Sequence, residues 1–85
     1  MAACRVLFRE SVWKDLRSIA ENDLGRILDR VSVLGVDPRS PGVEKLTGGD
    51  RYRIRQGRHR IVYSIQDDEL TLWGVKVRHR KDVYR

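Results

Sequence analysis

Residues 51–65 read RYRIRQGRHRIVYSI, and the architecture can be worked out from this stretch. Apolar and basic residues alternate on both sides of Gly57, a pattern typical of two strands that each bury one face. Tyr52 and Ile54 share one face of the first strand, so the arginines beside them occupy the other face. Gly57 predicts a tight turn, and the two strands are therefore expected to pair as an antiparallel hairpin.

The alternation continues along the chain in both directions from this hairpin. Strands are expected at residues 50–56, 58–66 and 69–78. Residues 66–68, which read Gln-Asp-Asp, are expected to form the turn between the last two strands. Near the N-terminus, Val6 and Phe8 alternate with Arg5, Leu7 and Arg9, which predicts a further short strand over 4–9.

Apolar residues at three- and four-residue spacing predict two helices between the first strand and the hairpin. Ser11 is the expected N-cap of the first helix, and Asn22 or Asp23 is the expected N-cap of the second. Gly35 is expected to end the second helix with a positive φ. The expected buried stripes consist of Trp13, Leu16, Ile19 and Ala20 in the first helix and Leu24, Ile27, Leu28, Val31 and Leu34 in the second.

The order of these elements predicts an α+β fold in one domain over 1–85. An N-terminal strand leads into an antiparallel two-helix hairpin, and an antiparallel three-strand meander follows. The helices are expected to pack on one face of an antiparallel sheet. A connector over 36–49 contains only turn chemistry, and residues 80–85 are expected to form a helical turn or a tail.

The net charge of +6 belongs entirely to the last 35 residues of the chain. Residues 1–50 carry eight basic and eight acidic side chains, whereas residues 51–85 carry ten basic and four acidic ones. The single cysteine, Cys4, excludes an internal disulfide and a four-cysteine zinc site, as is usual in a reducing compartment. No stretch has the roughly 20 apolar residues of a membrane span. We therefore expect a cytoplasmic protein without a membrane segment.

The arginines of the hairpin are the main functional signal. Antiparallel pairing across Gly57 is expected to bring Arg53 or Arg55 beside Arg60. Guanidinium groups gathered on one face repel one another unless an anion lies between them, which indicates a phosphate site and hence RNA or DNA as a partner. The alternative is a solvated face whose charges prevent edge-to-edge aggregation. Acidic residues that could neutralise the cluster lie mainly in the turn near Asp67.

The histidines and aromatic residues carry weaker signals. His59 is interpreted as a surface or packing residue, whereas cations on both sides of His79 favour its neutral form, which can accept a proton. Tyr84 is either a packing anchor or a phenol that reaches the basic face. Trp13 and Trp73 fit core positions. Two histidines without Cys or Asp partners at ligand spacing predict no metal site, and no nucleotide-binding or serine-hydrolase motif indicates a cofactor.

Five segments together resemble the RelE/ParE toxin superfamily of bacterial toxin–antitoxin modules. The resemblance extends over nearly the whole chain and is strongest from residue 37 onward. The segments are Asp37-Pro38-Arg39, Lys45-Leu46-Thr47-Gly48, Tyr52-Arg53-Ile54-Arg55, Arg60-Ile61-Val62-Tyr63 and His79-Arg80-Lys81-Asp82-Val83-Tyr84. Each is degenerate alone, but their order and spacing make the set specific.

This resemblance implies a fold like that of the microbial ribonucleases. In the RelE branch it implies a toxin that cuts mRNA in the ribosomal A site without a metal. The ribose 2′-OH attacks the adjacent phosphate, which leaves a cyclic phosphate and a free 5′-OH. Such a reaction needs a base, an acid and cations that stabilise the developing negative charge.

The resemblance also implies roles for individual residues. Arg60, Arg80, Tyr84 and His79 are the expected catalytic residues, and Arg51, Arg53, Arg55, Arg58, Arg78 and Lys81 are expected to bind RNA. Arg78 is the alternative to Arg80 as the late catalytic arginine. The best-known RelE enzymes have lysines where this chain has Arg53 and Arg55. Because arginine is a poor proton acceptor, the general base is expected to be Tyr84 or His79.

Two other functions fit the same resemblance and charge pattern. One is a ParE-type toxin that inhibits DNA gyrase, although such toxins usually lack the full set of basic residues and tyrosine. The other is a non-catalytic module that binds RNA or an acidic protein. A toxin of this superfamily also implies a cognate antitoxin, and an acidic, extended antitoxin segment would complement the basic face.

Overall fold

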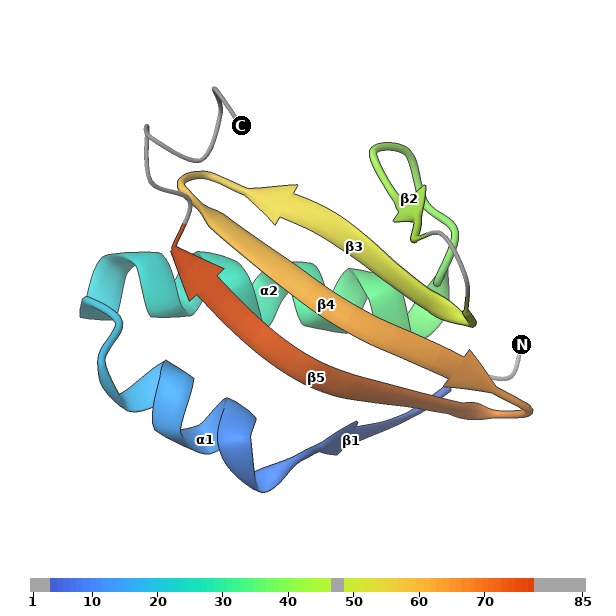
Figure 1. Cartoon of the computed structure of the whole chain (residues 1–85). Helices are drawn as coiled ribbons and strands as arrows, with labels where there is room; N and C mark the ends of the chain where they lie inside the picture. Colours follow the sequence, from blue (N-terminus) through green and yellow to red (C-terminus); the bar gives the residue numbers. More distant parts are fainter. Residues whose placement is uncertain (1–3, 47–48, 78–85) are drawn as a thin grey trace.

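The computed structural model describes residues 4–46 and 49–77 of the chain. Two helices and five strands make up the fold, and Figure 1 shows the sheet in front of the longer helix. The elements in chain order are β1 (Arg5–Phe8), α1 (Glu10–Arg17), α2 (Glu21–Val36), β2 (Glu44–Lys45), β3 (Arg51–Gln56), β4 (His59–Gln66) and β5 (Glu69–Val77). The α+β class and the order of the expected elements are confirmed.

The five strands form one mixed sheet in the order β1-β5-β4-β3-β2. The meander β3-β4-β5 is antiparallel as expected. Its first turn is tight, as Gly57 predicted, and this glycine has a positive φ of +61°. The expectation of a purely antiparallel sheet was wrong, because β1 pairs in parallel with β5. The connector also supplies the two-residue strand β2, which pairs with β3. Two residues are too few to show any alternation, so the sequence carried no signal for β2.

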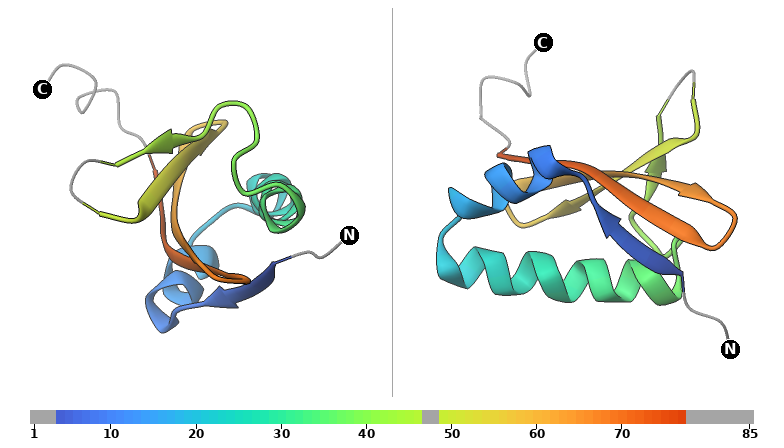
Figure 2. Two further views of the ribbon diagram at one scale, coloured as in Figure 1. Left: turned by 90° about the vertical axis from the view of Figure 1, so that its right-hand side faces the viewer. Right: turned by 90° about the horizontal axis from the view of Figure 1, so that it is seen from below.

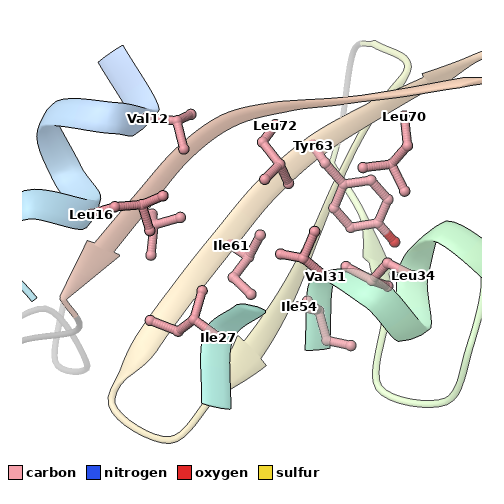
Figure 3. Close-up of a cluster of buried hydrophobic side chains, with 11 residues drawn as sticks. Val12, Leu16, Ile27, Val31, Leu34, Ile54, Ile61, Tyr63, Leu70 and Leu72 are labelled. Atoms are coloured by element: carbon pink, nitrogen blue, oxygen red, sulfur yellow. The ribbon is translucent and has the colours of Figure 1, made fainter. Parts of the chain in front are cut away.

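Helix α2 lies across one face of the sheet and closes the core (Figure 2). Isoleucine and leucine side chains from α2 meet those of the three central strands in a single cluster, with Val12 and Leu16 of α1 completing it (Figure 3). The fully buried side chains are Val12, Ile27, Leu34, Ile61, Tyr63, Leu70 and Leu72. Each helix makes its main contacts with the sheet, so the two-helix hairpin is held by the strands.

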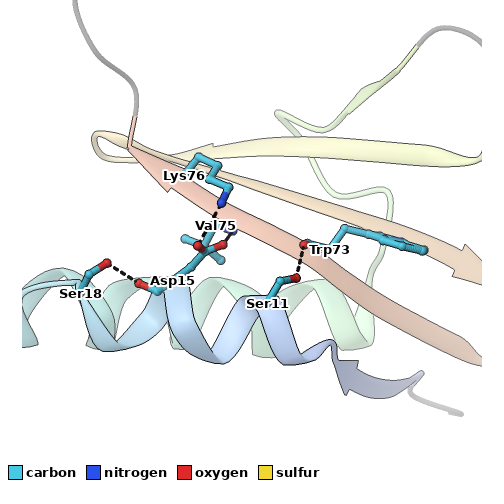
Figure 4. Close-up of polar contacts among 6 residues, drawn as sticks. All are labelled: Ser11, Asp15, Ser18, Trp73, Val75 and Lys76. Atoms are coloured by element: carbon cyan, nitrogen blue, oxygen red, sulfur yellow. Dashed lines mark hydrogen bonds and ion pairs between the residues drawn. The ribbon is translucent and has the colours of Figure 1, made fainter.

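Helix α1 covers the edge of β5 beyond the point where β1 ends. Strand β1 pairs with β5 only as far as Phe8 opposite Leu72, and α1 then runs beside the rest of β5. There the Asp15 carboxylate accepts a hydrogen bond from the Val75 backbone N–H at 3.0 Å and pairs with Lys76 at the same distance (Figure 4). The carboxylate thus replaces the carbonyl that a neighbouring strand would supply.

The expected helix caps were wrong. Helix α1 begins one residue before Ser11, with Arg9 at the N-cap, and the Ser11 hydroxyl instead donates to the Trp73 carbonyl at 3.3 Å. Helix α2 begins at Glu21, before both Asn22 and Asp23, and no side chain caps it. Packing on the sheet therefore sets where these helices start, and local capping does not.

Gly35 lies inside the last turn of α2, so its expected role in ending the helix was also wrong. A Cβ atom at this position would lie 3.2 Å from Cγ2 of Val6, and the Gly35 carbonyl accepts a hydrogen bond from the Cys4 N–H at 2.7 Å. Glycine is needed here for close approach of α2 to β1. The helix ends at Val36 because the residue before Pro38 disfavours helical dihedrals.

The expected apolar stripes were correct at most positions and wrong at three. Trp13 is 50% exposed and stacks on Phe8 with ring centroids 4.9 Å apart, while Val12 takes the core position. Leu28 of α2 is exposed as well. Ala20 also lies on the surface, beyond the end of α1. Helix α1 packs against the part of β5 that β1 leaves unpaired rather than against a broad sheet surface, so only a narrow stripe of the helix is buried.

Tyr63 links the connector between α2 and β2 to the sheet. Its side chain is fully buried, it stacks on Tyr52, and its hydroxyl donates a hydrogen bond to the Pro38 carbonyl at 2.6 Å. Burial, followed by the neighbouring Tyr52, raises the pKa of the Tyr63 phenol to about 12. Neither described helix is long and apolar enough to cross a membrane.

Candidate functional site

Basic side chains from three strands meet on the face of the sheet opposite α2. In the register of β3 and β4, Arg55 lies directly opposite Arg60, and Arg53 lies opposite Val62. On the other side of β4, Arg60 lies opposite Lys76 of β5. The predicted placement of Arg55 beside Arg60 is confirmed. Lys76 pairs with Asp15, but Arg55 and Arg60 are like charges on directly opposed residues, which destabilise a sheet unless an anion lies between them.

A shallow depression of about 60 Å³ lies among these side chains. It is lined by Glu44, Arg53, Ile54, Arg55 and Arg60, and we call it the arginine pocket. One water molecule occupies about 10–15 Å³ by the same measure, so the pocket has room for an anion of a few heavy atoms. A phosphate group has this size, and guanidinium groups bind it through paired N–H donors.

Glu44 is the one acidic residue that lines the arginine pocket. Its carboxylate lies 3.6 Å from the Arg53 guanidinium, and both side chains are substantially exposed. An exposed pair of this kind contributes about 0–1 kcal/mol, so an incoming phosphate can displace the carboxylate from Arg53 easily. Glu44 was not among the residues expected at the site, because only the pairing of β2 with β3 brings this part of the connector there.

The other expected RNA-binding residues in the described part of the chain lie elsewhere. Arg51 lies at the far end of β3, with its guanidinium 4.0 Å from the ring centroid of Trp73. Arg58 lies in the turn after Gly57 and lines a separate depression beside His59 and Asp23. His59 is buried, so of the two interpretations given to it, a surface or a packing residue, the structure selects packing.

Trp73 lies on the outer face of the sheet with its indole only partly buried, so the core position expected for it was wrong. A β-bulge between Val62 and Tyr63 explains the difference. Val62 pairs with Gly74 but Tyr63 pairs with Leu72, which leaves Trp73 as the extra residue of β5. The bulge shifts the alternation, and no pattern in β5 alone could have predicted it.

The remaining expected site residues are Arg78, His79, Arg80, Lys81 and Tyr84, which lie outside the described residues. Their assignment stays a prediction. Within residues 4–46 and 49–77, no three His, Cys, Asp or Glu side chains lie together as a metal site would require. The described part of the site therefore offers three guanidinium groups for an anion and one carboxylate that can accept a proton.

Comparison with known proteins supplies the family. A family model described as the ParE toxin of the type II toxin–antitoxin system parDE matches residues 6–84. The chain belongs to the RelE/ParE superfamily of toxins. The resemblance seen in the sequence is thereby confirmed. No curated protein has a significant sequence match to this toxin.

Solved toxin structures share the fold of this superfamily member. RelE from the RelE–RelB complex of the archaeon Pyrococcus horikoshii is 31% identical, with a TM-score of 0.80 over 92% of this chain and 98% of that chain. The isolated RelE toxin of E. coli superposes with a TM-score of 0.82 at 24% identity, over 98% of this chain and 92% of that chain. The toxin of the Mycobacterium tuberculosis RelBE2 complex also gives 0.82, at 20% identity, over 92% and 94% of the two chains.

Proposed function

We propose that this toxin is a ribosome-dependent mRNA endoribonuclease that arrests translation in the cytoplasm. The observation that carries the proposal is the arginine pocket, in which Arg53, Arg55 and Arg60 surround a space of phosphate size with a carboxylate at its rim. Identity of 31% to an archaeal RelE over nearly the whole length supports the RelE branch.

The chemistry follows from what each group can do. The 2′-OH of one nucleotide attacks its own 3′-phosphate, and the bond from phosphorus to the next 5′-oxygen breaks. Arg53, Arg55 and Arg60 stabilise the charge that develops on the phosphorane oxygens, the kind of term that contributes most to such reactions. Arginine stays protonated at any physiological pH, so none of these three residues can take the 2′-OH proton.

Glu44 is the described residue best suited to accept that proton. It lines the pocket together with all three arginines, and a carboxylate is a competent general base. His79 and Tyr84 remain the alternatives from the sequence. In this proposal Arg80 stabilises the phosphorane, and one of His79 and Tyr84 protonates the leaving 5′-oxygen.

The pocket accounts for the need for a ribosome. A depression of about 60 Å³ accommodates one phosphate but cannot fix the sugar and bases on either side of it. In-line attack requires that the 2′-OH, phosphorus and leaving oxygen be held in register, and such positioning contributes several kcal/mol to catalysis. The A site of the ribosome supplies this positioning for the codon that it holds.

A cognate antitoxin is the proposed protein partner. The Pyrococcus horikoshii and Mycobacterium tuberculosis relatives were each solved as a toxin–antitoxin complex. An acidic antitoxin segment that covers the arginine pocket would neutralise the toxin by competing with the phosphate.

Gyrase inhibition is the second candidate function, because the matching family model is that of ParE. The two functions are separated by mapping mRNA 5′ ends after purified toxin is added to a translating extract, beside the same RNA without ribosomes. Cuts within codons only in the presence of ribosomes are the expected result. Intact mRNA in both samples, together with inhibited DNA supercoiling by gyrase, would replace the nuclease with the ParE activity.

A further inference from the structure

A second cluster of cations lies on the same face of the sheet, at the other end of β3 from the arginine pocket. The Arg9 guanidinium lies over the Trp73 ring at 4.2 Å from its centroid, and the Arg51 guanidinium lies over the same ring at 4.0 Å. Arg9 comes from the junction of β1 and α1, whereas Arg51 is the first residue of β3. Tertiary structure alone brings these three residues together.

The indole is fixed in place. Its Nε1 donates a hydrogen bond to the Ser64 hydroxyl at 2.8 Å, and the Trp73 backbone carbonyl accepts one from Ser11 (Figure 4). Ser64 lies directly opposite Arg51 in the sheet, so the indole reaches across β4 toward β3. A guanidinium stacked on this fixed ring loses rotamer freedom before any ligand arrives, which lowers the entropy cost of binding.

Stacking leaves the hydrogen-bonding edge of each guanidinium free. Arginine has five N–H donors in the plane of the group, and contact with the ring uses only the face of that plane. Within residues 4–46 and 49–77, no carboxylate lies within ion-pair distance of Arg9 or Arg51, and both side chains are exposed. Two unneutralised cations held against one fixed ring make this part of the sheet surface attractive to an anion.

The position of the cluster identifies the anion. Arg51 and Arg55 lie four residues apart on the same face of β3, which is about 13 Å at the usual strand rise. A single RNA strand of a few nucleotides spans this distance when extended. Resting on the proposed nuclease function, we infer that Arg9, Arg51 and Trp73 form a second subsite, which binds a backbone phosphate of the same RNA strand whose scissile phosphate lies in the arginine pocket.

The subsite can be tested without cleavage. The probe is a fluorescent oligoribonucleotide with 2′-O-methyl groups throughout, which lacks the attacking hydroxyl. Its affinity is measured as a function of salt for wild type, for the double variant Arg9→Gln/Arg51→Gln and for Arg26→Gln. The last removes one charge from α2, on the opposite side of the sheet. Each lost phosphate contact lowers the slope of log K against log salt by about 0.7 for a single strand.

We expect the double variant to lower this slope by about 0.7 and to weaken binding several-fold, while Arg26→Gln leaves the slope unchanged. Trp73→Leu should weaken binding in the same way, and Trp73→Phe should preserve most of it because an aromatic face remains. A trinucleotide probe is too short to occupy both sites at once and can still bind in the arginine pocket, so the double variant should weaken its binding far less than that of the longer strand.

An unchanged slope in the double variant would overturn the subsite, as would an equal loss in Arg26→Gln. These outcomes are independent of the proposed function, which the mapping of mRNA 5′ ends tests. If wild type leaves mRNA intact but the double variant still lowers the slope, the nuclease is overturned and the subsite stands.

Discussion

Arg53 and Arg55 are separated by Ile54, whose side chain is buried, and this local pattern carries much of the candidate site. Strand geometry forces alternate residues to opposite faces, so burial of Ile54 places both arginines outward whatever surrounds them. Gly57 then fixes the turn that sets Arg55 opposite Arg60. At this scale the sequence alone predicts the positions of the arginines. It does not predict the position of Glu44, which reaches the arginine pocket only through a two-residue strand.

Glu44→Gln should separate catalysis from binding. Gln cannot accept the 2′-OH proton, so we expect cleavage of mRNA in a translating extract to fall by about 10²-fold or more. Loss of a negative charge beside Arg53 should strengthen binding of the 2′-O-methylated oligonucleotide. Unchanged cleavage would exclude Glu44 as the base and leave His79 and Tyr84, for which His79→Gln and Tyr84→Phe are the corresponding variants.

Tyr63 should make the protein sensitive to alkali. The folded-state pKa of about 12 lies above the ordinary value of 10.0, so the folded state retains the proton that the unfolded state loses. This contribution to stability is complete below pH 10 and disappears as the pH rises from 10 to 12, by about 3 kcal/mol in total. Denaturant unfolding at several pH values measures it.

Tyr63→Phe provides the control. It removes the hydrogen bond to the Pro38 carbonyl and should cost about 1–2 kcal/mol at neutral pH. Between pH 10 and 12 the variant should then lose less stability than wild type. Equal losses in the two proteins would show that another group causes the alkaline transition.

At the scale of the elements, contacts between the helices and the sheet determine where each helix begins and ends, in place of the local capping residues that usually do so. Neither helix has a side-chain N-cap, and Gly35 stays helical. In each case the sequence contained a good local signal at Ser11, Asn22 or Gly35, and tertiary packing used the residue differently. Burial of an apolar face contributes more free energy than one cap does, so the packing prevails.

The two glycines of α2 should respond differently to the same substitution. A Cβ atom at Gly25 meets nothing within 4 Å, so Gly25→Ala should stabilise the protein by about 0.5–1 kcal/mol through helix propensity. At Gly35 the Cβ atom lies 3.2 Å from Val6, so Gly35→Ala should gain less or destabilise. Thermal unfolding of the pair measures this, and an equal gain at both sites would contradict the close approach of α2 to β1.

Asp15 should hold α1 on the edge of β5 chiefly through its hydrogen bond with the Val75 backbone N–H. Asp15→Ala leaves the Val75 N–H without its acceptor and should cost about 1–3 kcal/mol. Lys76→Met removes only the ion pair at the largely exposed end of the Lys76 side chain and should cost less than about 1 kcal/mol. Similar losses in the two variants would mean that the ion pair, rather than the backbone contact, holds the helix.

At the scale of the whole molecule, the fold separates two surfaces of different character. Helix α2 covers one face of the sheet, and the opposite face carries Arg53, Arg55 and Arg60 together with Arg51, Trp73 and Arg9. A cationic sheet surface is suited to an extended polyanion.

Toxicity should therefore depend on the face from which a charge is removed. Arg55→Gln/Arg60→Gln should abolish growth arrest when the toxin is expressed without its antitoxin, because the phosphorane loses two of its cations. Arg26→Gln on α2 should leave growth arrest intact, which controls for the loss of a positive charge away from the arginine pocket. Growth arrest by the double variant, with normal expression, would contradict the placement of the active site in the arginine pocket.

The sequence by itself determined the α+β class, the limits of the meander and the outward row of arginines, because these depend on local periodicity and on glycine at one turn. Tertiary structure alone decided the parallel pairing of β1 with β5, the strand that carries Glu44, and the bulge that turns Trp73 outward. Each of these features depends on which distant strand a segment pairs with through its backbone N–H and C=O groups. The free energy of the whole sheet determines that pairing, so the sequence of the segment itself shows no pattern that predicts it.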